Sequence, residues 1–137
     1  MDDLELEINN LEKELTHKEA HIRNIREELC EELKNRNELI IEIDNLKEKQ
    51  ARKSKKVWTF TEEEKAYLRT ISKDYNFITK DKDSFYCELS KTEPKRRPVE
   101  GIYATDPNTR IHISEDALEL SCIKWEDYMP CPFRKFI

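Results

Sequence analysis

The stretch KEKQARKSKKVWTFTEEEKAYLRTI (residues 47–71) joins two segments of very different composition. Its first ten residues carry six basic side chains and one acidic one. The 46 residues before it hold 14 acidic and six basic side chains, with no glycine or proline. The 66 residues after it contain all five prolines and the single glycine. The junction therefore predicts an uninterrupted acidic helix on one side and a small, turn-containing domain on the other.

Apolar residues before the junction recur with alternating steps of three and four, which is the heptad pattern of a coiled coil. A straight helix of this length would extend about 75 Å and could not bury such a stripe without another helix. The sequence thus predicts self-association through residues 1–50. The predicted seam consists of Ile8, Leu15, Ile22, Leu29 and Ile43 at a positions, and Leu4, Leu11, Ile25, Leu39 and Leu46 at d positions.

Three seam positions are polar: Lys18 and Glu32 at d, and Arg36 at a. Polar residues at such positions weaken a seam and specify its register. Leu33 and Ile40, at e positions, widen the apolar face near them. The wider face indicates either more than two helices or docking against the C-terminal domain.

The flanking charges bear on helix orientation. A parallel pair would place Glu7 against Glu12 and Glu14 against Glu19 of the partner, with Glu42 and Lys47 as the clear attractive pair. An antiparallel pair would instead bring the acidic half beside the basic residues 47–56. The charges favour antiparallel helices, but both orientations, and dimers or larger assemblies, stay open.

The segment after the junction predicts a small α+β domain, and the division of the chain is 1–50 coiled coil, 51–56 basic linker and 57–137 domain. Thr61 and Glu64 form a capping-box pattern that starts a helix at about 61–72. Residues 74–80 and 84–90 read as a hairpin, and 101–105 with 110–114 as a second strand pair around Asp-Pro-Asn-Thr. Residues 91–101 read as a polar loop and 118–125 as a fifth strand. With one glycine available, backbone turns at positive φ are expected to be rare or to use Asn or Asp.

Basic residues form the predicted partner-binding surface. They suit phosphate or an acidic protein face, and those within residues 47–56 also suit a solvated helix end. The residues concerned are Lys53, Lys55, Lys56, Lys95, Arg96 and Arg97.

Catalytic signals are weak, so we expect a protein without enzymatic activity, cofactor or metal. The chain lacks the Gly-x-Ser-x-Gly, P-loop and His-Glu-x-x-His patterns. His17 and His21 share a helix face without a third ligand, and the spacing of Cys87, His112, Cys122 and Cys131 matches no familiar zinc module. The wide spacing of the cysteines predicts free thiols in a cytoplasmic protein. Because no apolar run is long enough for a membrane helix, we expect no membrane span.

The segments FTEEEKAYLRTISKDYNFITKDKD (60–83) and IKWEDYMP…FRKFI (123–137) resemble a group of small proteins encoded in phages and prophages of Gram-positive bacteria. The closing match rests on Ile123, Trp125, Asp127 and Pro130, with an apolar tail behind, whereas Cys122 and the Pro-Cys-Pro of 130–132 depart from the usual pattern. Proteins of this genomic setting include inhibitors of CRISPR–Cas and other host defences. The resemblance therefore implies an anti-CRISPR protein that blocks a Cas nuclease inside the bacterial host.

Two other functions remain open from the sequence. A phage DNA-binding regulator or replication accessory protein would use the basic residues on phosphates. A scaffold or adaptor would need only the coiled coil.

Overall fold

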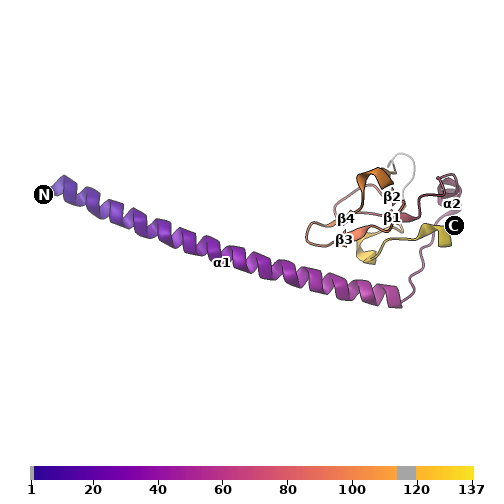
Figure 1. The fold of residues 1–137 in the computed structure, drawn as a ribbon, viewed down its shortest axis with the longest axis horizontal. Helices are drawn as coiled ribbons and strands as arrows, with labels where there is room; N and C mark the ends of the chain where they lie inside the picture. Colours follow the sequence, from indigo (N-terminus) through magenta and orange to yellow (C-terminus); the bar gives the residue numbers. More distant parts are fainter. Residues whose placement is uncertain (1, 114–119) are drawn as a thin grey trace. The chain divides into compact units, whose positions relative to one another are not determined.

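The computed structural model describes residues 2–113 and 120–137 and has the predicted α+β architecture. The chain divides into two compact units, Met1–Leu39 and Ile40–Ile137. Figure 1 shows the long helix first and the small strands and short helices after it. In chain order the elements are α1 (Asp3–Lys53), α2 (Glu62–Arg69), β1 (Phe77–Thr79), β2 (Glu88–Ser90), β3 (Lys95–Arg97), β4 (Ile102–Ala104), η1 (Pro107–Thr109), β5 (Arg110–His112), η2 (Trp125–Asp127) and η3 (Phe133–Lys135).

Helix α1 begins with a side-chain cap, since Asp2 Oδ1 accepts a hydrogen bond from the Glu5 N–H at 2.8 Å. It carries acidic residues in its first turn and basic ones in its last, as the helix dipole favours. The helix includes the first three residues of the predicted linker and ends at Lys53. Two residues later, Lys55 adopts a positive φ of 51°, which a continuing helix would not allow. Its last turns, from Ile40, belong to the second unit, which therefore starts well before the predicted residue 57.

Helix α2 has the predicted capping box. Thr61 Oγ1 accepts from the Glu64 N–H at 3.1 Å, and Glu64 Oε1 accepts from the Thr61 N–H at 2.8 Å. The helix ends at Arg69, earlier than predicted. Arg134, from the C-terminal tail, donates to the carbonyls of Ile71 and Ser72 just beyond that end.

The predicted hairpin is confirmed: β1 and β2 pair antiparallel, with Ile78 opposite Leu89. Strand β5 joins the other side of β2 and completes a sheet of order β1-β2-β5. Beyond β1, Ile78 and Cys131 exchange two backbone hydrogen bonds of 2.9 and 3.0 Å. The C-terminal segment thereby protects the β1 edge.

The second predicted strand pair is wrong. Strand β4 pairs with β3, not with β5, and the two form a separate antiparallel hairpin. The predicted polar loop at 91–101 therefore contains a strand. Gly101, at a φ of 70°, lies in the turn between β3 and β4, where an added Cβ would lie 3.1 Å from Lys82 Cβ. Among the described residues, Lys55 and Tyr128 also adopt positive φ, so such turns are rare, as expected, but none uses Asn or Asp.

The predicted fifth strand is not formed within its described residues, and residues 118–119 lie outside them. The chain turns at Ser121 and Cys122 and then enters the single turn of η2. Ile123 and Trp125 are buried nonetheless, so these side chains enter the interior from a turn.

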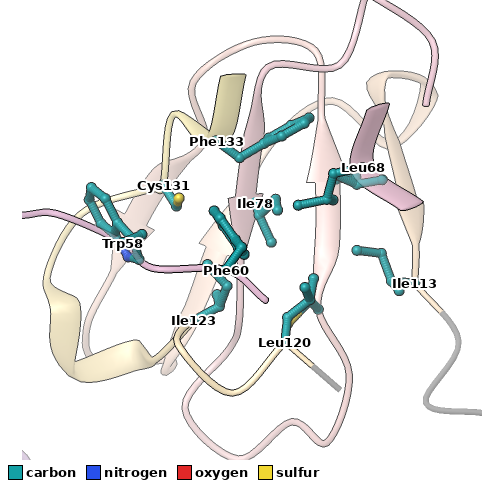
Figure 2. Close-up of a cluster of buried hydrophobic side chains, with 11 residues drawn as sticks. Trp58, Phe60, Leu68, Ile78, Ile113, Leu120, Ile123, Cys131 and Phe133 are labelled. Carbon is teal, nitrogen blue, oxygen red and sulfur yellow. The ribbon is translucent and has the colours of Figure 1, made fainter. Parts of the chain in front are cut away.

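The core lies between α2, the three-stranded sheet and the C-terminal segment. Figure 2 shows Ile78 at the centre of the labelled side chains, with Phe60, Leu68 and Phe133 around it. Leu68, Ile78 and Phe133 have no exposed surface. At about 25 cal/mol for each Å² of buried apolar surface, such side chains supply most of the driving force for folding. The cluster consists of Trp58, Phe60, Leu68, Ile78, Cys87, Leu89, Ile113, Leu120, Ile123, Cys131 and Phe133.

Candidate self-association surface

The predicted seam residues of α1 are exposed to solvent along the helix. Their relative exposures range from 48% for Ile22 to 70% for Leu4. An apolar stripe left in water loses the stabilisation that burial would give. A row of exposed apolar side chains of this kind is typical of a protein interaction site.

A different face of α1 turns toward the interior of the second unit. Asp44 is buried, while Ile40, Glu48 and Ala51 are half-buried. These positions lie roughly a third of a turn from Leu39, Ile43 and Leu46, since each helical residue advances about 100°. Because the two faces are separate, packing of the helix end on the domain leaves the seam open.

Arg96 fixes this helix face to the domain. Its Nε lies 2.8 and 3.0 Å from the two carboxylate oxygens of Asp44. Its Nη1 donates to the Tyr103 hydroxyl at 2.9 Å and to the Trp125 carbonyl at 2.6 Å. Its guanidinium carbon lies 3.4 Å from the centroid of the Trp125 ring, in a stacking arrangement that a planar guanidinium favours.

The surroundings of Arg96 are shielded from solvent. The side chains of Arg96 and Asp44 are only 3% and 8% exposed, and Arg96 Nη2 is buried without a hydrogen-bond partner. Burial raises the pKa of Tyr103 to about 12, against the opposing effect of the Arg96 charge. A buried ion pair of this kind mainly fixes geometry, and either charge left alone would be costly.

A second connection runs through Asp127, which is also buried. Its Oδ2 accepts from Trp58 Nε1 at 3.0 Å and from the Lys124 N–H at 3.1 Å, and its Oδ1 accepts from Lys56. Asp127 thus joins the segment after α1 to the C-terminal turn. Two members of the closing sequence pattern, Trp125 and Asp127, therefore act in the attachment of α1.

These contacts change the predicted partner-binding surface. Arg96 is removed from it, because β3 turns this side chain inward while Lys95 and Arg97 point outward. Lys56 is half-buried against Asp127. Lys53, Lys55, Lys95 and Arg97 remain exposed.

The clue to Arg96 that the sequence offered was strand alternation within the basic triplet, together with Asp44 at an outer heptad position. The three cations were predicted to lie in a polar loop and to bind a partner, because Arg is rarely buried unless paired. The pairing partner lies 52 positions away, so the local sequence could not reveal it.

The cysteines are free thiols in different settings: Cys30 is exposed, Cys122 half-buried, and Cys87 and Cys131 buried. Burial raises the pKa of the Cys87 and Cys122 thiols to about 11, and that of Cys131 further. Such thiols are mostly protonated at neutral pH and are poor nucleophiles. Within residues 2–113 and 120–137, no group of three or more His, Cys, Asp or Glu side chains is placed to hold a metal ion.

A hollow of about 380 Å³ lies beside Arg52, Phe77, Glu93, Pro130 and Arg134. Two of its cations are already engaged, since Arg52 bonds Glu93 at 2.6 Å and Arg134 bonds backbone carbonyls. The third cation that lines it, Lys135, is exposed to solvent. A single exposed lysine does not make a binding site, so we assign no ligand to the hollow.

Comparison of the chain with protein-family models, curated proteins and solved structures gives no match. Among the described residues, none of the helices combines the length and apolar character needed to cross a membrane.

Proposed function

We propose that this protein is a self-associating binding protein, without catalytic activity, that assembles through the seam of α1. The observation that carries the proposal is the exposed apolar stripe, from Leu4 to Leu46. The stripe stays open even where α1 packs on the domain through Asp44. A coiled coil would bury the part of it that pairs, because each paired seam residue would enter a hole formed by four residues of the facing helix.

The partner that we propose is a bacterial defence effector, most specifically a Cas nuclease in the cytoplasm of the host cell. The sequence resemblance to small phage and prophage proteins supports this role. The acidic residues of α1 suit a channel that normally receives nucleic acid, because both present closely spaced negative charge. The protein would then inhibit by occupying that channel.

Self-association is tested by a matched pair of variants, Ile25→Asp and Asn24→Asp. Both add one negative charge to the same turn of α1, but only Ile25→Asp places it in the seam. Light scattering on the intact chain should give more than one copy for the parent and for Asn24→Asp, and a shift toward one copy for Ile25→Asp. A parent chain that is monomeric at high micromolar concentration would overturn the assembly role.

Inhibition is tested by capture of purified Cas nucleases on the immobilised chain, followed by a DNA cleavage assay. We expect one effector class to bind and to lose cleavage activity. Ile25→Asp measures whether assembly is needed for this effect. Absence of binding to every effector class tested would overturn the inhibitor role and would leave a scaffold or adaptor as the function of the seam.

A DNA-binding regulator is the remaining alternative, and the observation that favours it is the set of exposed cations Lys53, Lys55, Lys95 and Arg97. The net charge of −5 opposes it, because duplex DNA repels an acidic chain.

A further inference from the structure

Two charged residues interrupt the seam of α1 at neighbouring layers. Glu32 occupies a d position and Arg36 the following a position, and both side chains are exposed. We propose that α1 pairs antiparallel with α1 of a second copy, with Glu32 of each chain opposite Arg36 of the other. This inference rests on the proposed self-association and specifies the partner, its orientation and its register.

The register that this pair sets also matches the apolar layers around it. It places Leu29 opposite Leu39, Ile25 opposite Ile43, and Ile22 opposite Leu46 of the second copy, and the same contacts recur by symmetry. Every apolar seam residue from Ile22 to Leu46 then faces an apolar residue, and the two charged ones face each other with opposite charges. In an antiparallel coiled coil each a residue packs against a d residue of the partner. All of these layers follow that rule, so one register satisfies them together.

A parallel, in-register pair produces the opposite result. Each polar seam residue would meet its own copy: Lys18 against Lys18, Glu32 against Glu32, and Arg36 against Arg36. Like charges at close range in a partly buried seam repel strongly, because the effective dielectric constant there is well below that of water. Three such layers outweigh the favourable flank contact between Glu42 and Lys47.

The flanks of the antiparallel pair are mixed. Glu19 lies opposite Lys47 of the second copy, which is attractive, although Lys47 Nζ also donates to its own Tyr128 hydroxyl at 3.1 Å. Leu33 lies opposite Leu33, which buries an apolar e position. Glu28 opposite Glu42 is repulsive. Exposed flank pairs contribute only about 0.2–1 kcal/mol each, so the seam decides the register.

This register pairs the helices over their C-terminal parts. Lys18 faces Gln50 and Leu15 faces Lys53, the last residue of the helix. Leu4, Ile8 and Leu11 then lie beyond the partner's seam. The pairing therefore predicts that Ile8→Asp leaves self-association within about threefold of the parent, whereas Ile43→Asp abolishes it. A parallel in-register seam would lose affinity with either variant.

Orientation is tested by disulfide crosslinking in a Cys30→Ser background, which removes the exposed thiol. Leu29→Cys and Leu39→Cys are prepared as separate chains, mixed under denaturing conditions, refolded and oxidised. We expect a crosslinked dimer only in the mixture. A crosslinked dimer from either chain alone would show a parallel seam and overturn the proposal.

Register is tested by charge reversal. Glu32→Arg and Arg36→Glu alone should each weaken self-association on the order of a hundredfold, because each creates like charges in the seam. The double variant E32R/R36E restores opposite charges and should return to within about threefold of the parent. A double variant no tighter than the singles would overturn the register.

A control separates this effect from pairing within one helix, because residues 32 and 36 are also four apart. Lys34 and Glu38 are also four apart and opposite in charge, but they lie on the outer face of the helix. The variant K34E/E38K exchanges these two charges without changing a seam residue. This variant and its two single changes should stay within about threefold of the parent. If the chain self-associates but none of the three crosslinking samples gives a dimer, the helices pair in another register and the proposal is overturned. If the parent chain is monomeric, the proposed function itself is contradicted.

Discussion

Arg96 holds together three segments that lie far apart in the chain. It bonds Asp44 of α1, the Tyr103 hydroxyl of β4 and the Trp125 carbonyl of η2. A lysine at this position could satisfy one of these acceptors as a point charge, but it lacks the planar fork and the flat face that stacks on Trp125. The attachment of the helix to the domain is therefore specific to arginine.

Removal of the Asp44 carboxylate should destabilise the second unit. Asp44→Ala leaves the Arg96 charge buried and uncompensated, which lowers the free energy of unfolding by about 3–5 kcal/mol. Glu42→Ala, an exposed change on the same helix, should stay within about 0.5 kcal/mol. Urea unfolding at equal protein concentration, followed by tryptophan fluorescence, checks this; equal losses in the two variants would contradict it.

The buried thiols make stability depend on alkaline pH. The pKa of Cys87 is about 11 in the fold and 9.0 without the fold's influence, so the folded state keeps a proton that the unfolded state releases. Its contribution is complete below pH 9 and is lost as the pH rises toward 11. At pH 10 the loss is about 1 kcal/mol for this thiol.

Urea unfolding of the reduced protein at pH 8, 9 and 10 measures this loss. Cys87→Ala should show a smaller decrease in unfolding free energy over the same range than the parent. Identical decreases would mean that other groups, such as lysines, cause the whole effect.

At the scale of elements, local signals predicted the helices and one hairpin well. The capping box of Thr61 and Glu64 and the long acidic helix depend on neighbouring residues, so their patterns are visible in sequence. The partner of β5 is not visible in this way. Its three residues pair with β2, some 20 positions earlier, and the Asp-Pro-Asn-Thr turn that predicted a local hairpin forms η1 instead.

The same contrast explains the candidate site. The heptad spacing predicts a seam on α1, and the structure shows that each of its apolar residues is exposed. Their role in self-association stays a prediction. The wider apolar face at Ile40 allowed docking on the domain as one alternative, but the spacing could not predict that Asp44 is buried there. The role of Ile40 and Asp44 depends on Arg96 and Trp125, which follow much later in the chain.

The end of α1 should therefore be part of the smallest stable domain. A chain of residues 40–137 keeps Asp44 and should unfold cooperatively, and it should be monomeric because it lacks most of the seam. A chain of residues 57–137 leaves Arg96 unpaired and should be less stable by about 3–5 kcal/mol. Light scattering and urea unfolding check both; equal stability of the two chains would show that α1 contributes nothing to the domain.

For the whole molecule, charge is distributed by segment. Residues 1–46 carry a net charge of −8, residues 47–56 +5 and residues 57–137 −2. The structure engages several of the cations internally, through Arg96 with Asp44, Lys56 with Asp127, and Arg52 with Glu93. Fewer positive charges are thus available to outside partners than the sequence suggests.

Duplex DNA should accordingly bind weakly. With Lys53, Lys55, Lys95 and Arg97 as the exposed members of the predicted surface, affinity at low salt should fall steeply as salt is added. Fluorescence anisotropy with a labelled duplex should show no binding at low micromolar protein and 150 mM salt. Submicromolar binding under those conditions, lost on changing Lys53 and Lys55 to Glu, would favour the DNA-binding alternative.

The separation of the two faces of α1 makes the chain suitable for exchange of parts. The seam residues before Ile40 take no part in the contacts of Asp44, so another coiled coil could be spliced ahead of residue 40 in heptad phase. A trimeric or tetrameric sequence there would present three or four domains in place of the native number. Such chimeras would make the copy number of the domain an experimental variable while its own interior stays unchanged.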